Sequence, residues 1–252
     1  MIESFYEAMA VPPACHLGKR VYKKLFLEHT KLGVADKTAL GDDVDIVTWQ
    51  YTFKPTTIPI HVYEDEAREY LEIALLEVKL KKTGRVHRLT EIIHRAIPYP
   101  LIVVFASDEG VSVSLAHKRF SQAEKDAIVA EDFISTGWFD PTEPDGVHAD
   151  FLKSLNISTW PHTHFFAFYK GVMARVVALE CARHTGVFQV DEGLSTEGRR
   201  DLLARCHEVE NRMVQLRAKI KKEKQFNRQV ELNMKIKELE QEFGRLMNGL
   251  RG

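Results

Sequence analysis

The sequence contains few cysteines and no long apolar run. Its three cysteines, Cys15, Cys181 and Cys206, are widely separated and odd in number. This excludes a disulfide framework and a CxxC zinc site, and it predicts a reducing cytoplasm. No apolar stretch approaches the roughly 18 residues of a membrane span. The first 15 residues also lack the basic and apolar regions of a signal peptide. We therefore expect a cytoplasmic protein without membrane contact.

Motifs of the common enzyme classes are absent as well. The chain has no GxSxG, P-loop, GxGxxG, HExxH or cysteine-rich zinc pattern, so nothing supports a serine hydrolase, a P-loop NTPase or a Rossmann enzyme. What is present is ordinary globular composition, with 252 residues, 44% hydrophobic and 28% charged. That length suffices for one large domain or two small ones.

Charge is unevenly distributed along the chain. From Arg199 onward there are 14 Lys/Arg against eight Asp/Glu, a net charge of +6. The whole chain carries −1, so the preceding residues carry −7. This asymmetry predicts that nucleic acid or an acidic partner meets the C-terminal part. The alternative is a long exposed helix whose charges are simply solvated.

Residues 1–140 have the pattern of a mixed α/β sheet in the order α-β-β-β-α-β-β-β. Helical spacing of apolar residues predicts helices at 19–29 and 85–97. Alternating or continuous apolar runs predict strands, at 46–53, 58–63, 70–82, 100–106, 111–120 and 127–139. The strand–helix–strand order around residues 85–97 implies a right-handed crossover between parallel strands.

A linker, "DPTEPDG", ends this domain, and helices follow. Residues 141–194 form a predicted helical segment that includes a helix apolar on nearly all sides. Residues 195–252 form a long basic tail with two series of apolar residues at alternating spacings of four and three. The two series do not share a register. The tail is therefore either one long helix that changes its packing face or an antiparallel coiled-coil hairpin. Either form is an interaction element, for self-association or for binding a partner protein.

The stretch "YLEIALLEVKLKK" places Glu77 and Lys79 on one face of a strand. This E-x-K spacing is half of the Mg²⁺ site of restriction-endonuclease-like nucleases, in which the carboxylate binds the ion and the lysine activates water. The second carboxylate is not at its usual place after Pro59. Asp65 or Glu64 is the nearest candidate to share the metal with Glu77. The alternatives are a nuclease-like fold without catalysis and an unrelated domain.

Other polar groups are candidates for phosphate or metal contacts. His94 and Arg95 lie on the helix expected to flank the E-x-K strand, and Lys118 and Arg119 end a strand. The basic tail adds Lys221, Lys222, Lys224 and Arg228 as candidate nucleic-acid contacts. His162 and His164 have the H-x-H spacing of some metal sites, although a helix start also explains them.

Several long phrases resemble a prokaryotic family of unknown function: "GKRVYKKLF", "YEDEAREYLEIALLEVKL", "EIIHRAIPYPLIVVF", "SLAHKR" and "EKQFNRQVELNMKIKELE". Members of that family occur in defence islands beside genes for restriction-type DNA methyltransferases and helicases. The resemblance supplies no catalytic residues. It implies an accessory subunit, an adaptor or scaffold of an anti-phage complex that acts with a helicase or methyltransferase. A Mg²⁺-dependent nuclease and a nucleic-acid-binding module without chemistry are the alternative hypotheses.

Overall fold

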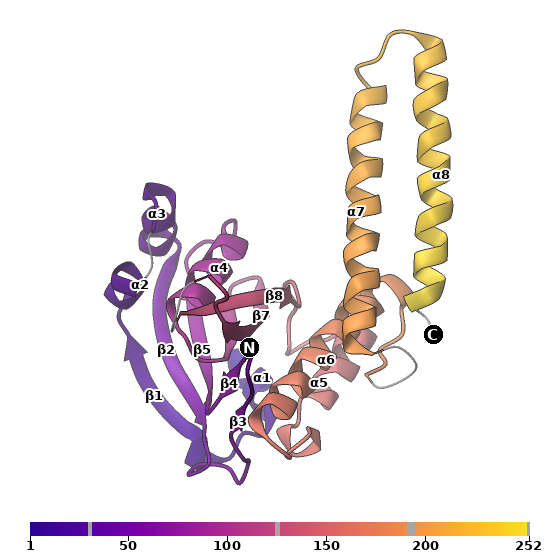
Figure 1. Ribbon diagram of the computed structural model, residues 1–252. Coiled ribbons are helices and arrows are strands. Elements are labelled where there is room, and N and C mark those ends of the chain that lie inside the picture. The colour runs from indigo at the N-terminus through magenta and orange to yellow at the C-terminus, as the bar shows by residue number, and fades with distance from the viewer. Residues whose placement is uncertain (30–31, 124–126, 191–194, 251–252) are drawn as a thin grey trace. The chain divides into compact units, whose positions relative to one another are not determined.

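The computed structural model describes residues 1–29, 32–123, 127–190 and 195–250 (Figure 1). These residues form two compact units, Met1–Val176 and Val177–Gly252. The boundary lies within a helix, whereas the sequence changes character near residues 140 and 195. No helix among the described residues is long and apolar enough to cross a membrane.

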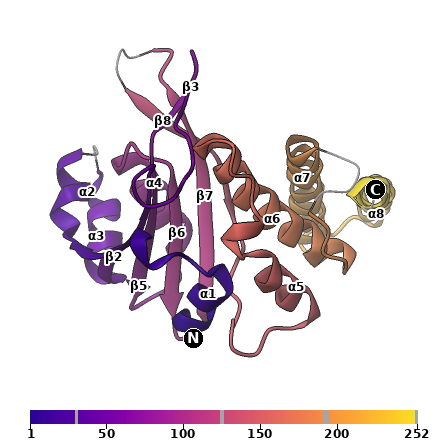
Figure 2. The same ribbon diagram turned by 90° about the horizontal axis from the view of Figure 1, so that it is seen from below.

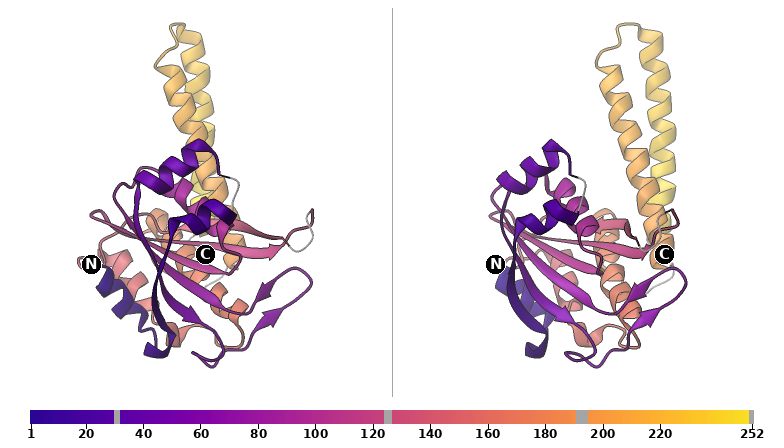
Figure 3. Two further views of the ribbon diagram at one scale, coloured as in Figure 1. Left: turned by 90° about the vertical axis from the view of Figure 1, so that its left-hand side faces the viewer. Right: turned by 60° about the vertical axis from the view of Figure 1, so that its left-hand side comes forward.

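The first unit is built on a six-stranded mixed sheet, which confirms the α/β class predicted from the sequence. The spatial order is β1-β2-β5-β6-β7-β8. β5 and β6 are parallel, and the other neighbouring pairs are antiparallel. The strands are β1 (His16–Val21), β2 (Val44–Phe53), β5 (Ile73–Leu80), β6 (Leu101–Ser107), β7 (Gly110–Phe120) and β8 (Ile128–Ser135). Figure 3 shows them together with a separate short hairpin, β3 (Tyr63–Glu64) and β4 (Glu69–Tyr70).

Helices lie on both sides of this sheet in the first unit (Figure 2). They are α1 (Ile2–Met9), α2 (Lys23–His29), α3 (Val34–Asp42), α4 (Val86–Ala96), α5 (Gly146–Ser154) and the first part of α6 (Phe165–Thr185). There are also two 3₁₀ turns, Pro13–Cys15 between α1 and β1 and Ile157–Thr159 between α5 and α6. The crossover helix α4 between the parallel strands β5 and β6 is where the sequence predicts it.

One face of the sheet packs against α2, α3 and α4. Leu89, Ile93 and Ala96 lie on one side of α4 and are buried against Leu76 and Val78 of β5. Pro98 follows and prevents the helix from continuing. Each strand alternates its side chains between faces, so these β5 residues are those that point away from Glu77.

Two bidentate ion pairs attach α4 to the segment that precedes β2. Arg85 donates to both carboxylate oxygens of Asp43, at 2.6 and 2.7 Å. Arg88 does the same to Asp36, at 2.5 and 2.9 Å. Hydrogen bonds from these guanidinium groups lower the pKa of both carboxyls. Paired planar donors fix orientation as well as distance, so they set how α4 lies on the sheet.

The opposite face of the sheet packs against α1 and the first part of α6. The buried Tyr169 hydroxyl shares its one proton between the backbone oxygens of Leu101 and Ala116, at 2.8 and 2.9 Å, and accepts from the Ala116 N–H. The Phe168 ring lies 5.5 Å from that of Phe53 on β2. α6 therefore joins β6 and β7 from the side on which Glu77 lies.

Three expected elements differ from the sequence prediction. The strand expected at 70–82 is shorter, because Tyr70 pairs in β4 of the separate hairpin and β5 begins only at Ile73. Residues 19–29 were expected to be one helix, but the strand β1 ends at Val21 and the helix α2 begins at Lys23. Residues 58–63 were expected to be a strand of the main sheet. Instead Ile58 and Ile60 are buried in a connection, and His61 makes only an isolated bridge to His164. Pro59 lacks the N–H that a paired strand would use there.

The second unit contains the C-terminal helices α7 (Thr196–Ile220) and α8 (Phe226–Leu250), which run antiparallel (Figure 1). Of the two forms left open by the sequence, the structure has the hairpin, with its turn after Ile220. Buried residues such as Cys206, Val209 and Ile236 form the seam, and Arg217 pairs with Glu240 at 3.1 Å. Each helix has 25 residues, or about 37 Å at 1.5 Å per residue.

Candidate functional site

Glu77 and Lys79 lie on one face of β5, as strand alternation predicts. The Lys79 Nζ atom is 3.6 Å from Glu77 Oε1. The Lys79 side chain is half exposed, whereas Glu77 is buried. Both residues are near the carboxyl end of β5, beside the parallel strand β6. Ligands of open α/β sheets commonly bind at such ends, so the position suits a site.

Tyr6 of α1 contacts the second oxygen of Glu77. Its hydroxyl donates to Oε2 at 2.9 Å, and its ring packs edge-on against Tyr51 at 5.4 Å. Burial, together with the neighbouring Glu77 carboxylate, raises the pKa of Tyr6 well above its ordinary value. Both oxygens of Glu77 are thus engaged, one by a phenol and one by an ammonium group. A metal ion would have to displace one of them.

Asp65 lies outside the six-stranded sheet that contains Glu77, in the turn of the separate β3–β4 hairpin. It accepts hydrogen bonds from the Tyr63 hydroxyl at 2.7 Å and from the backbone N–H groups of Ala67 and Arg68 at 2.8 Å each. These bonds, that from Tyr63 foremost, lower the pKa of Asp65. The carboxylate therefore stabilises the turn of the β3–β4 hairpin. Glu64 belongs to the same hairpin and is exposed.

The strand register gives the separation between this hairpin and Glu77. Phe120, at the end of β7, donates to the backbone oxygen of Ala67. Glu77 is level with Val104 of β6, which is level with Val113 of β7. Seven residues of strand separate Val113 from Phe120, or about 23 Å at 3.3 Å per residue. The structure does not bring Asp65 and Glu77 together, and these residues do not form the predicted Mg²⁺ site.

His94 and Lys118 are core residues. His94 is fully buried, with its Nε2 atom 3.2 Å from the Ser114 hydroxyl. Lys118 is 2% exposed, and its amine donates to the backbone oxygens of His94 and Ile97 at the end of α4. Neither side chain reaches the surface, so the prediction that these residues contact a phosphate is wrong. α4 also covers the sheet face opposite to Glu77.

The remaining predicted nucleic-acid contacts are on the surface. Arg95 is half exposed and lies 3.8 Å from Glu91, and Arg119 pairs with Glu131 at 2.5 Å. Lys221, Lys222 and Lys224 are exposed in the turn between α7 and α8, and Arg228 follows in the first turn of α8. The turn is thus a cluster of cations at one end of the hairpin.

An exposed apolar stripe adjoins this cationic turn. Phe226, Val230 and Met234 are 75%, 42% and 62% exposed, and their spacing of four residues places them on one side of α8. The seam with α7 uses other residues of α8, among them Ile236 and Leu239. The hairpin therefore has an apolar side that its own partner helix does not cover.

The H-x-H pair has structural contacts that explain both histidines. His164 Nδ1 accepts from the Ala167 N–H at 3.0 Å at the start of α6, and its ring stacks on Tyr63. The His162 Nε2 atom lies 2.9 Å from the Ile157 backbone oxygen.

Among the described residues, a different group brings possible metal-ligand atoms within 4.8 Å of one another: His184, His207 and Glu210 of the second unit. The sequence alone indicates this group of three residues only weakly. His207 and Glu210 are three residues apart, but His184 comes from a separate helix.

Comparison with known proteins identifies a family for this chain. A family model described as "Domain of unknown function (DUF4391)" matches residues 9–243, so the chain belongs to that family. No curated protein and no solved structure matches it.

Proposed function

We propose that this member of the DUF4391 family is an accessory subunit of a bacterial DNA-defence complex. In this proposal the α7–α8 hairpin is the element that binds the partner, a helicase or DNA methyltransferase. The observation that carries the proposal is the exposed stripe of Phe226, Val230 and Met234. Three large apolar side chains in a row on one helix are characteristic of a protein-binding surface.

The charges around the stripe favour an acidic partner surface. Lys222, Lys224 and Arg228 lie in the turn or first turn beside Phe226, and Lys235 follows Met234. An apolar stripe with a cationic border fits a partner groove that is apolar at its centre and acidic at its rim. The resemblance of the sequence to proteins of defence islands supports the class of partner.

A co-expression experiment tests this proposal. The chain would be co-expressed with a helicase and, separately, with a restriction-type DNA methyltransferase of the same organism, and complexes would be measured by size exclusion and light scattering. We expect a stable complex with one of them. The triple variant Phe226→Ser, Val230→Ser, Met234→Ser should weaken it at least about 100-fold, because three buried anchors contribute more than about 3 kcal/mol in an interface.

A matched control variant tests whether any loss of binding is specific to the stripe on α8. Tyr22, Val34 and Leu71 are also exposed apolar residues, but they lie on the first unit. The triple variant Tyr22→Ser, Val34→Ser, Leu71→Ser should bind as the wild type does. Equal binding by both triple variants, or no complex with either enzyme, would contradict the proposal. A homodimer that the stripe variant abolishes would assign the stripe to a second copy of the chain.

A second candidate function is a Mg²⁺-dependent nuclease, favoured by the Glu77–Lys79 pair at the carboxyl end of β5. The donor set near it does not fit a shared Mg²⁺ ion, because both Glu77 oxygens are engaged and Asp65 is remote. Supercoiled DNA would be incubated with the chain and Mg²⁺ or Mn²⁺. Cleavage that Lys79→Ala abolishes and that the nearby exposed control Lys82→Ala retains would favour the nuclease over the accessory subunit.

A further inference from the structure

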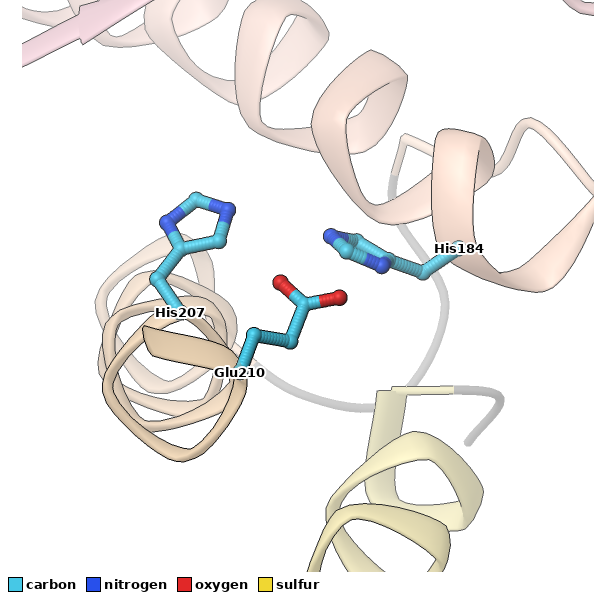
Figure 4. Close-up of side chains that lie close together, drawn as sticks. All are labelled: His184, His207 and Glu210. Atoms are coloured by element: carbon cyan, nitrogen blue, oxygen red, sulfur yellow. The ribbon is translucent and has the colours of Figure 1, made fainter. Parts of the chain in front are cut away.

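Two helices of the second unit place two imidazoles and one carboxylate together. His184 is in the last turn of α6, and His207 and Glu210 are three residues apart on one side of α7. Figure 4 shows the Glu210 carboxylate between the two imidazole rings. The rings are 5.8 Å apart between centroids.

The distances are close to those that one ion requires. One ligand atom from each residue lies within 4.8 Å of the others. Two ligands of a tetrahedral zinc ion at about 2.0–2.2 Å are separated by roughly 3.3–3.6 Å. The remaining difference of roughly 1.3 Å is within the range of side-chain rotation. His207 is exposed, and His184 and Glu210 are partly exposed, so packing does not prevent that rotation.

The local charge favours a cation at this position. α6 ends next to His184, and Gly186 has a φ of 79°, with its N–H bonded to the Ala182 oxygen at 2.7 Å. The carbonyl end of a helix carries partial negative charge, and Glu210 adds a full one. The nearby cation Arg183 is paired with Glu180 at 3.3 Å.

We propose that His184, His207 and Glu210 bind a divalent transition-metal ion, zinc foremost. Two nitrogens and one carboxylate oxygen form a donor set that suits zinc and its first-row neighbours rather than Mg²⁺ or Ca²⁺. Three protein ligands leave a fourth position for water. The ion would fix the end of α6 to α7, and thus hold the base of the hairpin.

Titration of the purified full chain with Zn²⁺ and Co²⁺ tests the proposal. Calorimetry should give one equivalent of Zn²⁺ per chain, and bound Co²⁺ should develop visible absorption. His184→Asn, His207→Asn and Glu210→Gln should each weaken Zn²⁺ binding more than about 100-fold, since even changes in groups around a ligand cost roughly 10–100-fold. Binding should weaken on acidification, because protons compete for the imidazole nitrogens.

Matched exposed residues provide the controls. Glu208→Gln is beside the site on α7, and His87→Asn is on α4; both variants should bind Zn²⁺ as the wild type does. Circular dichroism would verify that every variant keeps its helices. Equal affinity in the ligand and control variants would overturn the site. A thiolate charge-transfer band in the Co²⁺ spectrum would place the ion on cysteine and would also overturn it.

Discussion

The buried amine of Lys118 makes the stability of the first unit depend on pH in a predictable direction. Lys118 is 2% exposed and its amine contacts the last carbonyls of α4. Burial lowers the pKa of this amine from 10.5 to about 7. The folded chain therefore releases the proton near pH 7, whereas the unfolded chain keeps it to about pH 10.5. Between these values unfolding takes up a proton, so the free energy of unfolding rises with pH.

The size of the effect follows from the two pKa values. One pKa unit corresponds to about 1.36 kcal/mol. With a folded pKa of about 7, raising the pH from 7 to 9 should stabilise the wild type by about 2 kcal/mol relative to Lys118→Met. The methionine has a similar length and no titratable group. Other groups that titrate in this range contribute equally to both proteins and cancel in the difference.

Urea unfolding followed by tryptophan fluorescence measures this difference. Trp49, Trp138 and Trp160 all lie in the first unit, so the signal reports on the unit that contains Lys118. With a slope of about 2 kcal/mol/M, the midpoint of the wild type should move by about 1 M relative to the variant. A difference that is flat between pH 7 and 9 would refute the reasoning. It would mean that the α4 carbonyls hold the amine in its charged form.

Two further predictions concern Gly110, whose backbone conformation disfavours other residues, and the cationic turn. Gly110 has a φ of 120°, and a Cβ atom there would lie 2.2 Å from the Phe139 oxygen. Gly110→Ala should therefore lower the free energy of unfolding, measured with urea, by roughly 2–6 kcal/mol. Gly84 has open space around it, so the control Gly84→Ala should be nearly neutral. If the hairpin turn binds DNA, replacing Lys221, Lys222, Lys224 and Arg228 by alanine should reduce the slope of log K against log salt by up to about 3.6 for four phosphate contacts. An unchanged slope would show that the turn does not contact the phosphates.

Much of the fold follows from local patterns in the sequence. The spacing of Leu89 and Ile93 and the stop at Pro98 specify α4, and the apolar run of residues 101–105 specifies a buried strand. The edge strand β1 could not be found this way. Its residues are almost all exposed, so it forms through backbone pairing with β2 and has no apolar alternation to reveal it.

The sequence likewise predicts the positions of only some of the candidate site residues. Alternation along one strand was enough to place Glu77 beside Lys79. It could not place Asp65, because the β3–β4 hairpin bonds to the far end of β7 through Ala67 and Phe120. The burial of Lys118 was equally hidden, since only the packing of α4 on β7 brings carbonyls to its amine. Likewise, His184 meets His207 only through the packing of α6 and α7.

The hairpin of α7 and α8 also has a consequence for the order in which the chain folds. Its contacts beside the turn between Ile220 and Phe226 join residues that are close in sequence, and pairing can extend from there along the helices, whereas every residue pair between the parallel strands β5 and β6 spans 27 residues. Local contacts form faster because they cost less loop entropy. The two helices can therefore pair on a faster timescale than the sheet, even though they follow it in the chain. The exposed apolar row of Phe226, Val230 and Met234 would then be in place before the fold of the first unit is complete.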